Sequence, residues 1–174
     1  MTGGTNRSIV TITLGLVLLL TGVARAEDGP GELHSVLKGM FRFSAVKTCT
    51  EAVLGSMVHF YFSGAIVYDG NGSAKLTQQG TVVLPGSTAT SFEESAQLTY
   101  VLKPNGSFVQ QGTFIAVDHS YTVTGARMIG QIDAQGSLLM LNGPIPAEQE
   151  TVTTSGGSVS QYLCGASGTA VRIR

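Results

Sequence analysis

Residues 57–84 read MVHFYFSGAIVYDGNGSAKLTQQGTVVL, and this stretch decides the fold class. In its first half, one alternating set is apolar: Val58, Phe60, Phe62, Gly64, Ile66 and Tyr68. Side chains alternate between the two faces of a β-strand, whereas an amphipathic helix places apolar residues three and four positions apart. The sequence Asp69-Gly70-Asn71-Gly72 then supplies the residues that tight hairpin turns prefer. The stretch therefore predicts a long β-hairpin.

The pattern of β-rich runs separated by turn residues continues along the chain. Further strands are predicted at Phe41–Cys49, Ala96–Lys103, Ser107–Val117, Tyr121–Asp133, Ser137–Asn142, Glu150–Thr154 and Ser158–Cys164, with residues 169–173 as an extension of the last. The segment Glu32–Met40 is expected to form a short helix or an irregular cap. Glycines inside the long runs mark bends of a curved sheet. We expect an all-β fold, a closed antiparallel up-and-down barrel of about eight or nine strands, with a two-sheet β-sandwich as the alternative.

The first 26 residues have the layout of a signal peptide. Arg7 precedes the uncharged apolar run Ile9–Val23, and Ala24-Arg25-Ala26 is a cleavage signal of the A-x-A type. A retained membrane anchor is the alternative, but the run is shorter than the roughly 20 residues that span a bilayer. We therefore expect residues 1–26 to be cleaved, residues 27–174 to form a single domain, and the protein to be secreted or periplasmic.

The charge of the mature chain argues against nucleic-acid binding. Without Arg7 and Arg25, eight of the ten basic residues remain against eleven acidic ones, a formal charge of −3. Nucleic-acid-binding proteins instead show a clustered basic surface. The second face of most predicted strands is polar, so we do not expect the barrel to span a membrane. The sequence does not predict an oligomeric state.

The two cysteines, Cys49 and Cys164, lie near opposite ends of the mature chain. In an oxidising compartment such a pair is most simply a disulfide, and two buried free thiols are the alternative. A bridge would enclose 114 intervening residues. It would also place the first and last strands side by side, as a closed barrel requires.

No catalytic or metal-binding motif is present. The three histidines, His34, His59 and His119, do not have metal-ligand spacing, and neither a nucleophile elbow nor an H-E-x-x-H or C-x-x-C motif occurs. The sequence therefore predicts no catalytic residue, no metal and no cofactor. The acidic residues Glu93, Glu94, Glu148 and Glu150 are interpreted as solvated rim positions.

The inward-facing aromatic residues are the most informative candidates. A barrel of about eight strands is either filled by its own side chains or holds one small ligand. If it holds a ligand, the predicted lining is Phe60, Phe62, Tyr68, Tyr100, Phe108, Phe114, Tyr121 and Arg127. Arg127 belongs to the alternating set of Tyr121 and Val123, and facing inward it would need an anionic partner. A bulge at Gly125 would instead turn it outward.

Three short patterns carry a resemblance to known proteins. They are the F-x-F-S strand at Phe41–Ser44 that leads to Cys49, the Asp69–Gly72 hairpin turn, and the closing C-G-x-S-G segment at Cys164–Gly168. In these the chain resembles a loose group of exported bacterial β-barrel proteins without an assigned role. Its architecture also looks like that of lipocalins and other calycin-type barrels, although the lipocalin G-x-W motif is absent and the chain has no Trp.

The first functional hypothesis is an exported module that binds a small apolar or amphipathic ligand. The second is a barrel enzyme of the cyclase or isomerase type, which the calycin resemblance implies, with Tyr100, Tyr121 and Arg127 as acid–base aids. The third is a structural or interaction protein with a filled core. A binding module without catalysis is favoured over the enzyme.

Overall fold

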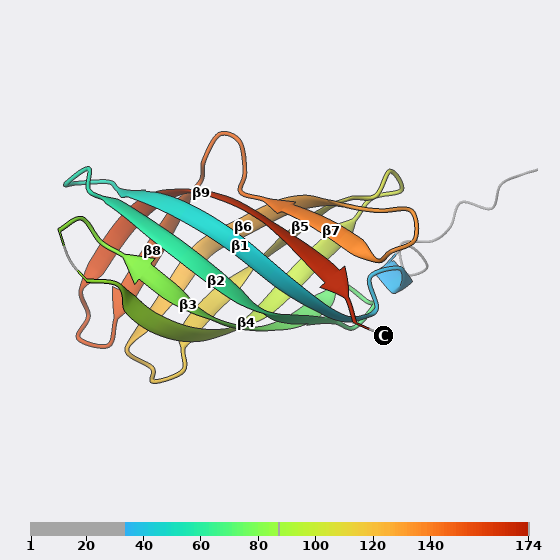
Figure 1. Ribbon diagram of the computed structural model, residues 1–174, viewed down its shortest axis with the longest axis horizontal. Helices are drawn as coiled ribbons and strands as arrows, with labels where there is room; N and C mark the ends of the chain where they lie inside the picture. Colours follow the sequence, from blue (N-terminus) through green and yellow to red (C-terminus); the bar gives the residue numbers. More distant parts are fainter. Residues whose placement is uncertain (1–33, 87, 174) are drawn as a thin grey trace, which may run out of the picture.

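The computed structural model describes residues 34–86 and 88–173, and this part of the chain folds into one closed β-barrel (Figure 1). Its strands are β1 (Gly39–Glu51), β2 (Met57–Tyr68), β3 (Ser73–Val83), β4 (Thr90–Leu102), β5 (Ser107–Ala116), β6 (Tyr121–Ile132), β7 (Leu138–Asn142), β8 (Gln149–Thr154) and β9 (Val159–Arg172). The predicted signal peptide lies outside the described residues.

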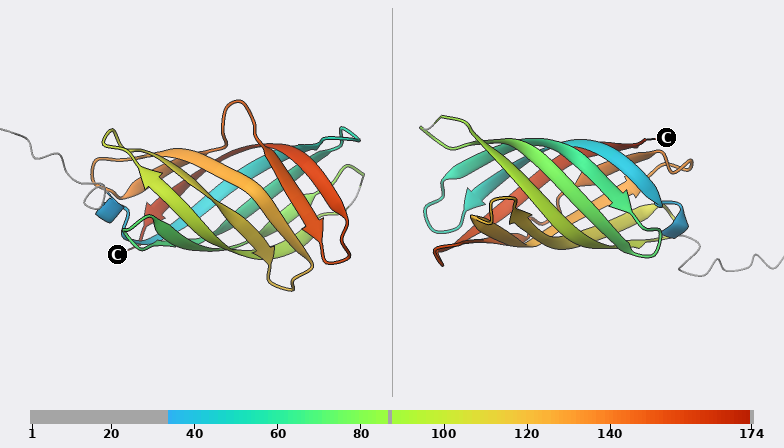
Figure 2. Two further views of the ribbon diagram at one scale, coloured as in Figure 1. Left: turned by 180° about the vertical axis from the view of Figure 1, so that it is seen from behind. Right: turned by 90° about the horizontal axis from the view of Figure 1, so that it is seen from below.

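Every strand pairs antiparallel with its neighbours, and β9 closes the ring against β1. β7 and β8 both lie between β6 and β9: β7 pairs with residues 129–132 of β6, and β8 with residues 121–124. They therefore act as one interrupted eighth strand of the wall, and residues 143–148 leave the wall as an outward loop (Figures 1 and 2). This closed antiparallel barrel confirms the predicted fold class and excludes the two-sheet sandwich.

The central hairpin is confirmed, with β2 and β3 paired from Tyr68↔Ala74 to His59↔Val83. The largest extensions beyond the predicted strands are in β4 and β9. β4 begins at Thr90 rather than at Ala96, and β9 runs without interruption through residues 165–168 to Arg172. Cys49 and Cys164 form the predicted disulfide.

One end of the barrel is filled and capped. Residues 34–38, within the segment expected to form a short helix or an irregular cap, form a single turn, with the Leu37 N–H donating to the His34 carbonyl at 3.0 Å. The side chain of Leu37 is completely buried in the core beneath this turn. The remaining core side chains at this end include Phe41, Tyr68, Leu98, Tyr100, Leu102, Phe108, Ile132 and Leu139. Each such side chain contributes about 1.5–3 kcal/mol by leaving water.

Edge-to-face aromatic contacts and one buried hydrogen bond stabilise the filled end. The ring of Tyr68 meets the ring of Tyr100 edge-on at 5.1 Å, and that of Phe41 at 5.5 Å. The Tyr68 hydroxyl donates to Oε1 of the buried Gln110 at 2.7 Å. Burial raises the pKa of Tyr68, so its hydroxyl keeps the proton that this bond requires.

Candidate ligand-binding cavity

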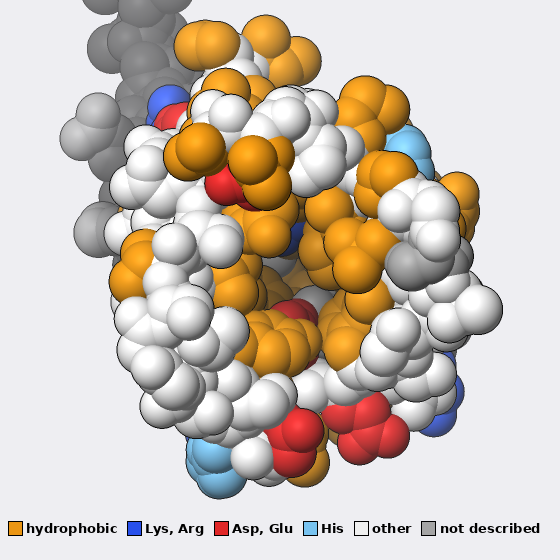
Figure 3. All heavy atoms as spheres, turned by 90° about the vertical axis from the view of Figure 1, so that its left-hand side faces the viewer, with side chains coloured by type: hydrophobic (Ala, Val, Ile, Leu, Met, Phe, Trp, Pro, Cys, Tyr) orange, Lys and Arg blue, Asp and Glu red, His pale blue; other side chains and the backbone are white. Residues whose placement is uncertain are grey.

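The opposite half of the barrel is hollow. A cavity of about 800 Å³ opens at the end where the β1–β2, β5–β6 and β8–β9 turns lie. Figure 3 looks into this mouth and shows hydrophobic side chains surrounding the hollow, with acidic atoms visible inside it. The apolar part of the lining includes Phe43, Val58, Phe60, Phe62, Ile66, Leu76, Val82, Phe92, Phe114, Val123, Met128 and Leu141. The volume lies within the range of ligand pockets, about 300–1,000 Å³.

An aromatic wall runs across β1, β2 and β4. The ring centroid of Phe92 lies 5.9 Å from that of Phe60 and 6.4 Å from that of Phe62. Phe62 in turn meets Phe43 edge-on at 6.2 Å. Phe62, Gly80 and Phe92 are direct cross-strand neighbours, so a Cβ at Gly80 would lie 2.7 Å from the Cβ of Phe62. The pairing register therefore gathers these rings on one side of the cavity.

A carboxylate faces this wall from β4. Glu94 is 8% exposed and lines the cavity. Its Oε1 accepts a hydrogen bond from the Tyr121 hydroxyl at 2.8 Å, and its Oε2 accepts one from Nε2 of Gln78. Burial, and then the negative charge of Glu94, raise the pKa of Tyr121, which therefore remains a hydrogen-bond donor near neutral pH.

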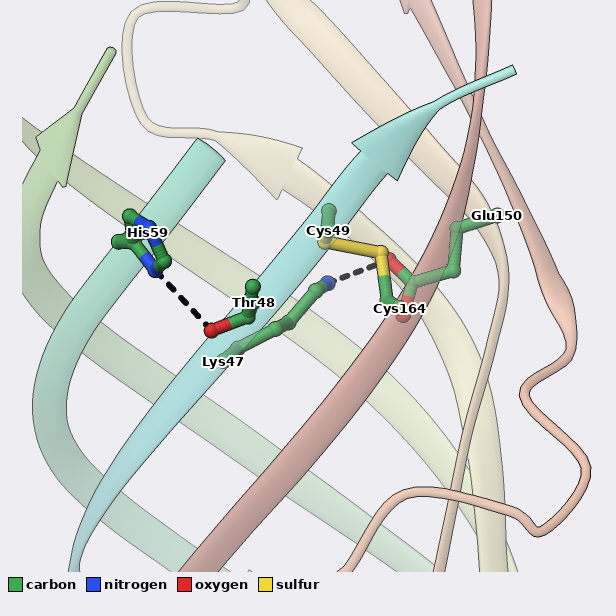
Figure 4. The surroundings of a disulfide bond; sticks show 6 residues. All are labelled: Lys47, Thr48, Cys49, His59, Glu150 and Cys164. Carbon is green, nitrogen blue, oxygen red and sulfur yellow. Dashed lines mark hydrogen bonds and ion pairs between the residues drawn. A yellow bond between two sulfur atoms is a disulfide. The ribbon is translucent and has the colours of Figure 1, made fainter. Parts of the chain in front are cut away.

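A second polar group lies beside the disulfide. Nζ of Lys47 forms an ion pair with Glu150, with the two side chains 20% and 11% exposed (Figure 4). The same Nζ lies 5.6 Å from the centroid of the Phe60 ring. Because Lys47 is on β1 and Glu150 on β8, this pair links two parts of the wall across β9.

The interpretation of the acidic residues as solvated rim positions is wrong for Glu94 and Glu150, both of which are buried. The sequence contained a usable pattern. Glu94 continues the alternating set of Leu98 and Tyr100 toward the N-terminal end of β4, where no strand was predicted. Lys47 likewise follows Phe43 and Ala45 in the inward set of β1. Glu93 is exposed, as predicted.

The predicted ligand-lining residues fall into two groups. Phe60, Phe62, Phe114 and Tyr121 line the cavity. Tyr68, Tyr100 and Phe108 face inward too, but they belong to the filled end and do not reach the hollow half. A Cβ at Gly130 would lie 2.3 Å from the Phe108 ring, so this ring packs directly on the backbone of β6.

Arg127 lies at the edge of the cavity, where β6 is bulged. Gly125 has a φ of +79°, which glycine adopts readily, and the β5–β6 register shifts between Gly112 and Phe114. The bulge changes the phase of the strand, so that Val123 and Ala126 are both buried. The guanidinium of Arg127 pairs with Glu148, with the side chains 36% and 43% exposed. The three predicted acid–base aids are therefore not brought together.

None of the three histidines lines the cavity. Nε2 of His34 accepts from the Leu102 N–H at 3.3 Å at the filled end, and Nδ1 of His59 is 3.1 Å from the Thr48 hydroxyl on the outside (Figure 4). His119 occupies the β5–β6 turn with a φ of +58°. Within residues 34–86 and 88–173, no three His, Cys, Asp or Glu side chains are grouped as metal ligands, and no helix there is long and apolar enough to cross a membrane.

No protein-family model and no curated protein matches this sequence. Among solved structures, the chain is similar to an S-type phycobiliprotein lyase from Guillardia theta. The two share 9% sequence identity with a TM-score of 0.38, and the match covers 82% of this chain and 92% of that chain. Similarity at this level supports no argument about ligand or activity.

Proposed function

We propose that this protein binds one small apolar or amphipathic molecule in the hollow half of its barrel. The observation that carries the proposal is the contrast between the two ends. Tightly packed aromatic residues fill one end, whereas the other keeps an open cavity of about 800 Å³ with a mainly apolar lining. Exposed apolar surface inside a protein is costly unless something covers it, so a retained hollow of this size favours an occupant.

Two features support binding by a preformed site. The cavity walls are strands hydrogen-bonded on both sides around most of the ring, and the Cys49–Cys164 disulfide joins β1 to β9 beside the hollow. A ligand entering such a site loses little free energy to reorganisation of the protein. The cavity also opens directly to the exterior at the mouth (Figure 3).

An exported location is part of the proposal. It is supported by the signal-peptide layout of residues 1–26 and by the disulfide, since disulfides form and persist chiefly in oxidising compartments.

Native mass spectrometry of the protein purified from its own host tests the proposal. We expect a retained small molecule that dissociates on collisional activation and that is lost when the protein is unfolded and refolded in its absence. A protein of unliganded mass that also fails to bind any apolar fluorescent probe would overturn it.

A further inference from the structure

The hollow half contains a buried carboxylate without a buried positive partner. Glu94 is 8% exposed, and its two hydrogen bonds come from neutral donors, the Tyr121 hydroxyl and the Gln78 amide. Among the described residues, the ion pairs are Lys47–Glu150 and Arg127–Glu148, and neither includes Glu94. An ionised carboxylate in apolar surroundings is unfavourable unless a positive charge compensates it.

The charges on the cavity wall do not balance. Lys47 neutralises Glu150. The guanidinium of Arg127 pairs with Glu148, and Arg127 does not belong to the set of β6 residues that alternate toward the interior after the bulge. With both buried carboxylates ionised, the interior side chains Lys47, Glu94 and Glu150 carry a formal charge of −1. The cavity therefore favours a positively charged occupant over a negatively charged one.

The rings around Glu94 suit a cation as well. Phe92 is two residues before Glu94 on the same face of β4, and Phe62 lies across β3 from Phe92. Phe114 on β5 lines the same hollow. The negative faces of aromatic rings attract ammonium groups, and a carboxylate among several rings is the arrangement by which proteins recognise substituted ammonium ions.

We propose that the ligand is a cationic amphiphile, with an amine or quaternary ammonium head paired to Glu94 and an apolar body against the phenylalanine rings. This inference rests on the proposed function, because it names the chemical class of the molecule held in the same cavity. Glu94 is then the counter-ion of the ligand, and Tyr121 and Gln78 hold its carboxylate in position.

Isothermal titration calorimetry with three probes of equal chain length tests the inference. The probes are decyltrimethylammonium, decan-1-ol and decyl sulfate, each below its micelle concentration. The quaternary ammonium is attracted by the Glu94 carboxylate and by the faces of the phenylalanine rings, and the alcohol is not, so we expect the cation to bind at least about tenfold more tightly than the alcohol. Decyl sulfate should bind most weakly of the three.

The variant Glu94→Gln keeps the shape of the side chain and removes its charge. In this variant we expect the cation and the alcohol to bind within about threefold of each other, because the preference depends on the charge of Glu94. Glu93→Gln is the matched control: the adjacent Glu93 also borders the cavity but is exposed, so water screens its charge and this variant should keep the preference. Tyr121→Phe removes one neutral donor from Glu94, and this variant should keep the preference for the cation or increase it.

The outcomes separate this inference from the proposed function. Equal affinity of the wild-type protein for cation and alcohol, tighter binding of decyl sulfate, or a preference that survives Glu94→Gln would overturn the cationic class while leaving the binding function intact. No binding of any of the three probes would count against both. The wild-type comparison needs no variant, so the inference is tested even if Glu94→Gln does not fold.

Discussion

Cys49 and Cys164 lie directly opposite each other in the β1–β9 ladder, with their Cα atoms 4.1 Å apart. The disulfide therefore joins the first and last strands at the seam where the barrel closes. The ladder around it extends from Phe41↔Arg172 to Glu51↔Tyr162, so the seam also has many backbone hydrogen bonds that do not depend on sulfur. The disulfide stabilises the fold mainly by restricting the unfolded chain, whereas the hydrogen bonds of the ladder stabilise the folded barrel.

Replacing both cysteines by alanine should therefore weaken the fold without opening the barrel. The bridge spans a sequence separation of 115 residues, for which chain-entropy arguments give about 4–5 kcal/mol. We expect Cys49→Ala/Cys164→Ala to lower the free energy of unfolding by about 2–5 kcal/mol, measured by urea denaturation, with an unchanged far-UV spectrum. Loss of β-structure in the absence of denaturant would show that the ladder alone does not close the ring.

The buried pair of Tyr68 and Gln110 provides a test of the filled end. Removing one partner leaves the other buried without its hydrogen bond, at a cost of about 1–3 kcal/mol. Tyr68→Phe and Gln110→Leu should each destabilise the protein by that amount, and the double variant by less than the sum of the two. Because neither residue lines the hollow half, the affinity for a cavity ligand should stay the same. A large loss of affinity in Tyr68→Phe would place Tyr68 in the binding site after all.

A pair of tryptophan variants on β3 tests whether the hollow is where the ligand binds. Val82 lines the cavity and pairs with Phe60, whereas its neighbour Val83 alternates to the outer face. Val82→Trp should occupy part of the volume and reduce the affinity for decan-1-ol by about tenfold or more, measured by calorimetry. Val83→Trp is the control and should bind as the wild type does. Equal binding by both variants would exclude the hollow as the site.

The sequence predicted the hairpins well. Apolar alternation indicates the strands, and the residues between them indicate the turns, so both signals are local. At Asp69–Gly72, the Asp69 carboxylate accepts hydrogen bonds from the backbone N–H groups of Asn71 and Ser73, as such turns commonly show. The disulfide could be predicted from cysteine number and compartment. A hairpin can be predicted from residues close together in the sequence, and the disulfide from the presence of only two cysteines.

The division of the barrel into a filled and a hollow half could not be predicted in the same way. The two-residue alternation shows that these aromatic side chains face inward, but not how far along the barrel each one lies. The register between neighbouring strands determines that Phe41, Tyr68 and Tyr100 meet at one end. The polar site residues were missed for a different reason. Lys47 lay within a predicted strand, but a charged residue there gave no sign that it faces a cavity, and Glu94 lies before the predicted start of its strand, where polar side chains interrupt the apolar pattern. The sequence suggested a bulge at Gly125 that would turn Arg127 outward. The register of β5 and β6 shows that the bulge is present.

The stability of the β2–β3 turn should depend on pH through Asp69. Hydrogen bonds from the N–H groups of Asn71 and then Ser73 lower the pKa of this carboxyl below its usual value. A group with a lowered pKa in the folded state stabilises the fold above its unfolded pKa, and this contribution is lost as pH falls through the folded pKa. The wild type should therefore lose its advantage over Asp69→Asn as the pH falls below about 4, the usual pKa of an aspartate, measured as the difference in urea midpoint. A difference that does not change with pH would contradict this role.

The variant Arg127→Leu separates the two interpretations of this arginine. If its guanidinium served an acidic ligand in the cavity, its loss would weaken the binding of decanoate by an order of magnitude or more. Because the guanidinium pairs with Glu148 and the bulge at Gly125 changes the phase of β6, we expect unchanged affinity for decanoate and for decan-1-ol, within about twofold, in calorimetry. Since both partners are more than one-third exposed, the free energy of unfolding should fall by less than about 1 kcal/mol. Glu148→Gln is the matched control and should show the same small effect, whereas a selective loss of decanoate binding in Arg127→Leu would make Arg127 part of the site and contradict the cationic preference assigned to Glu94.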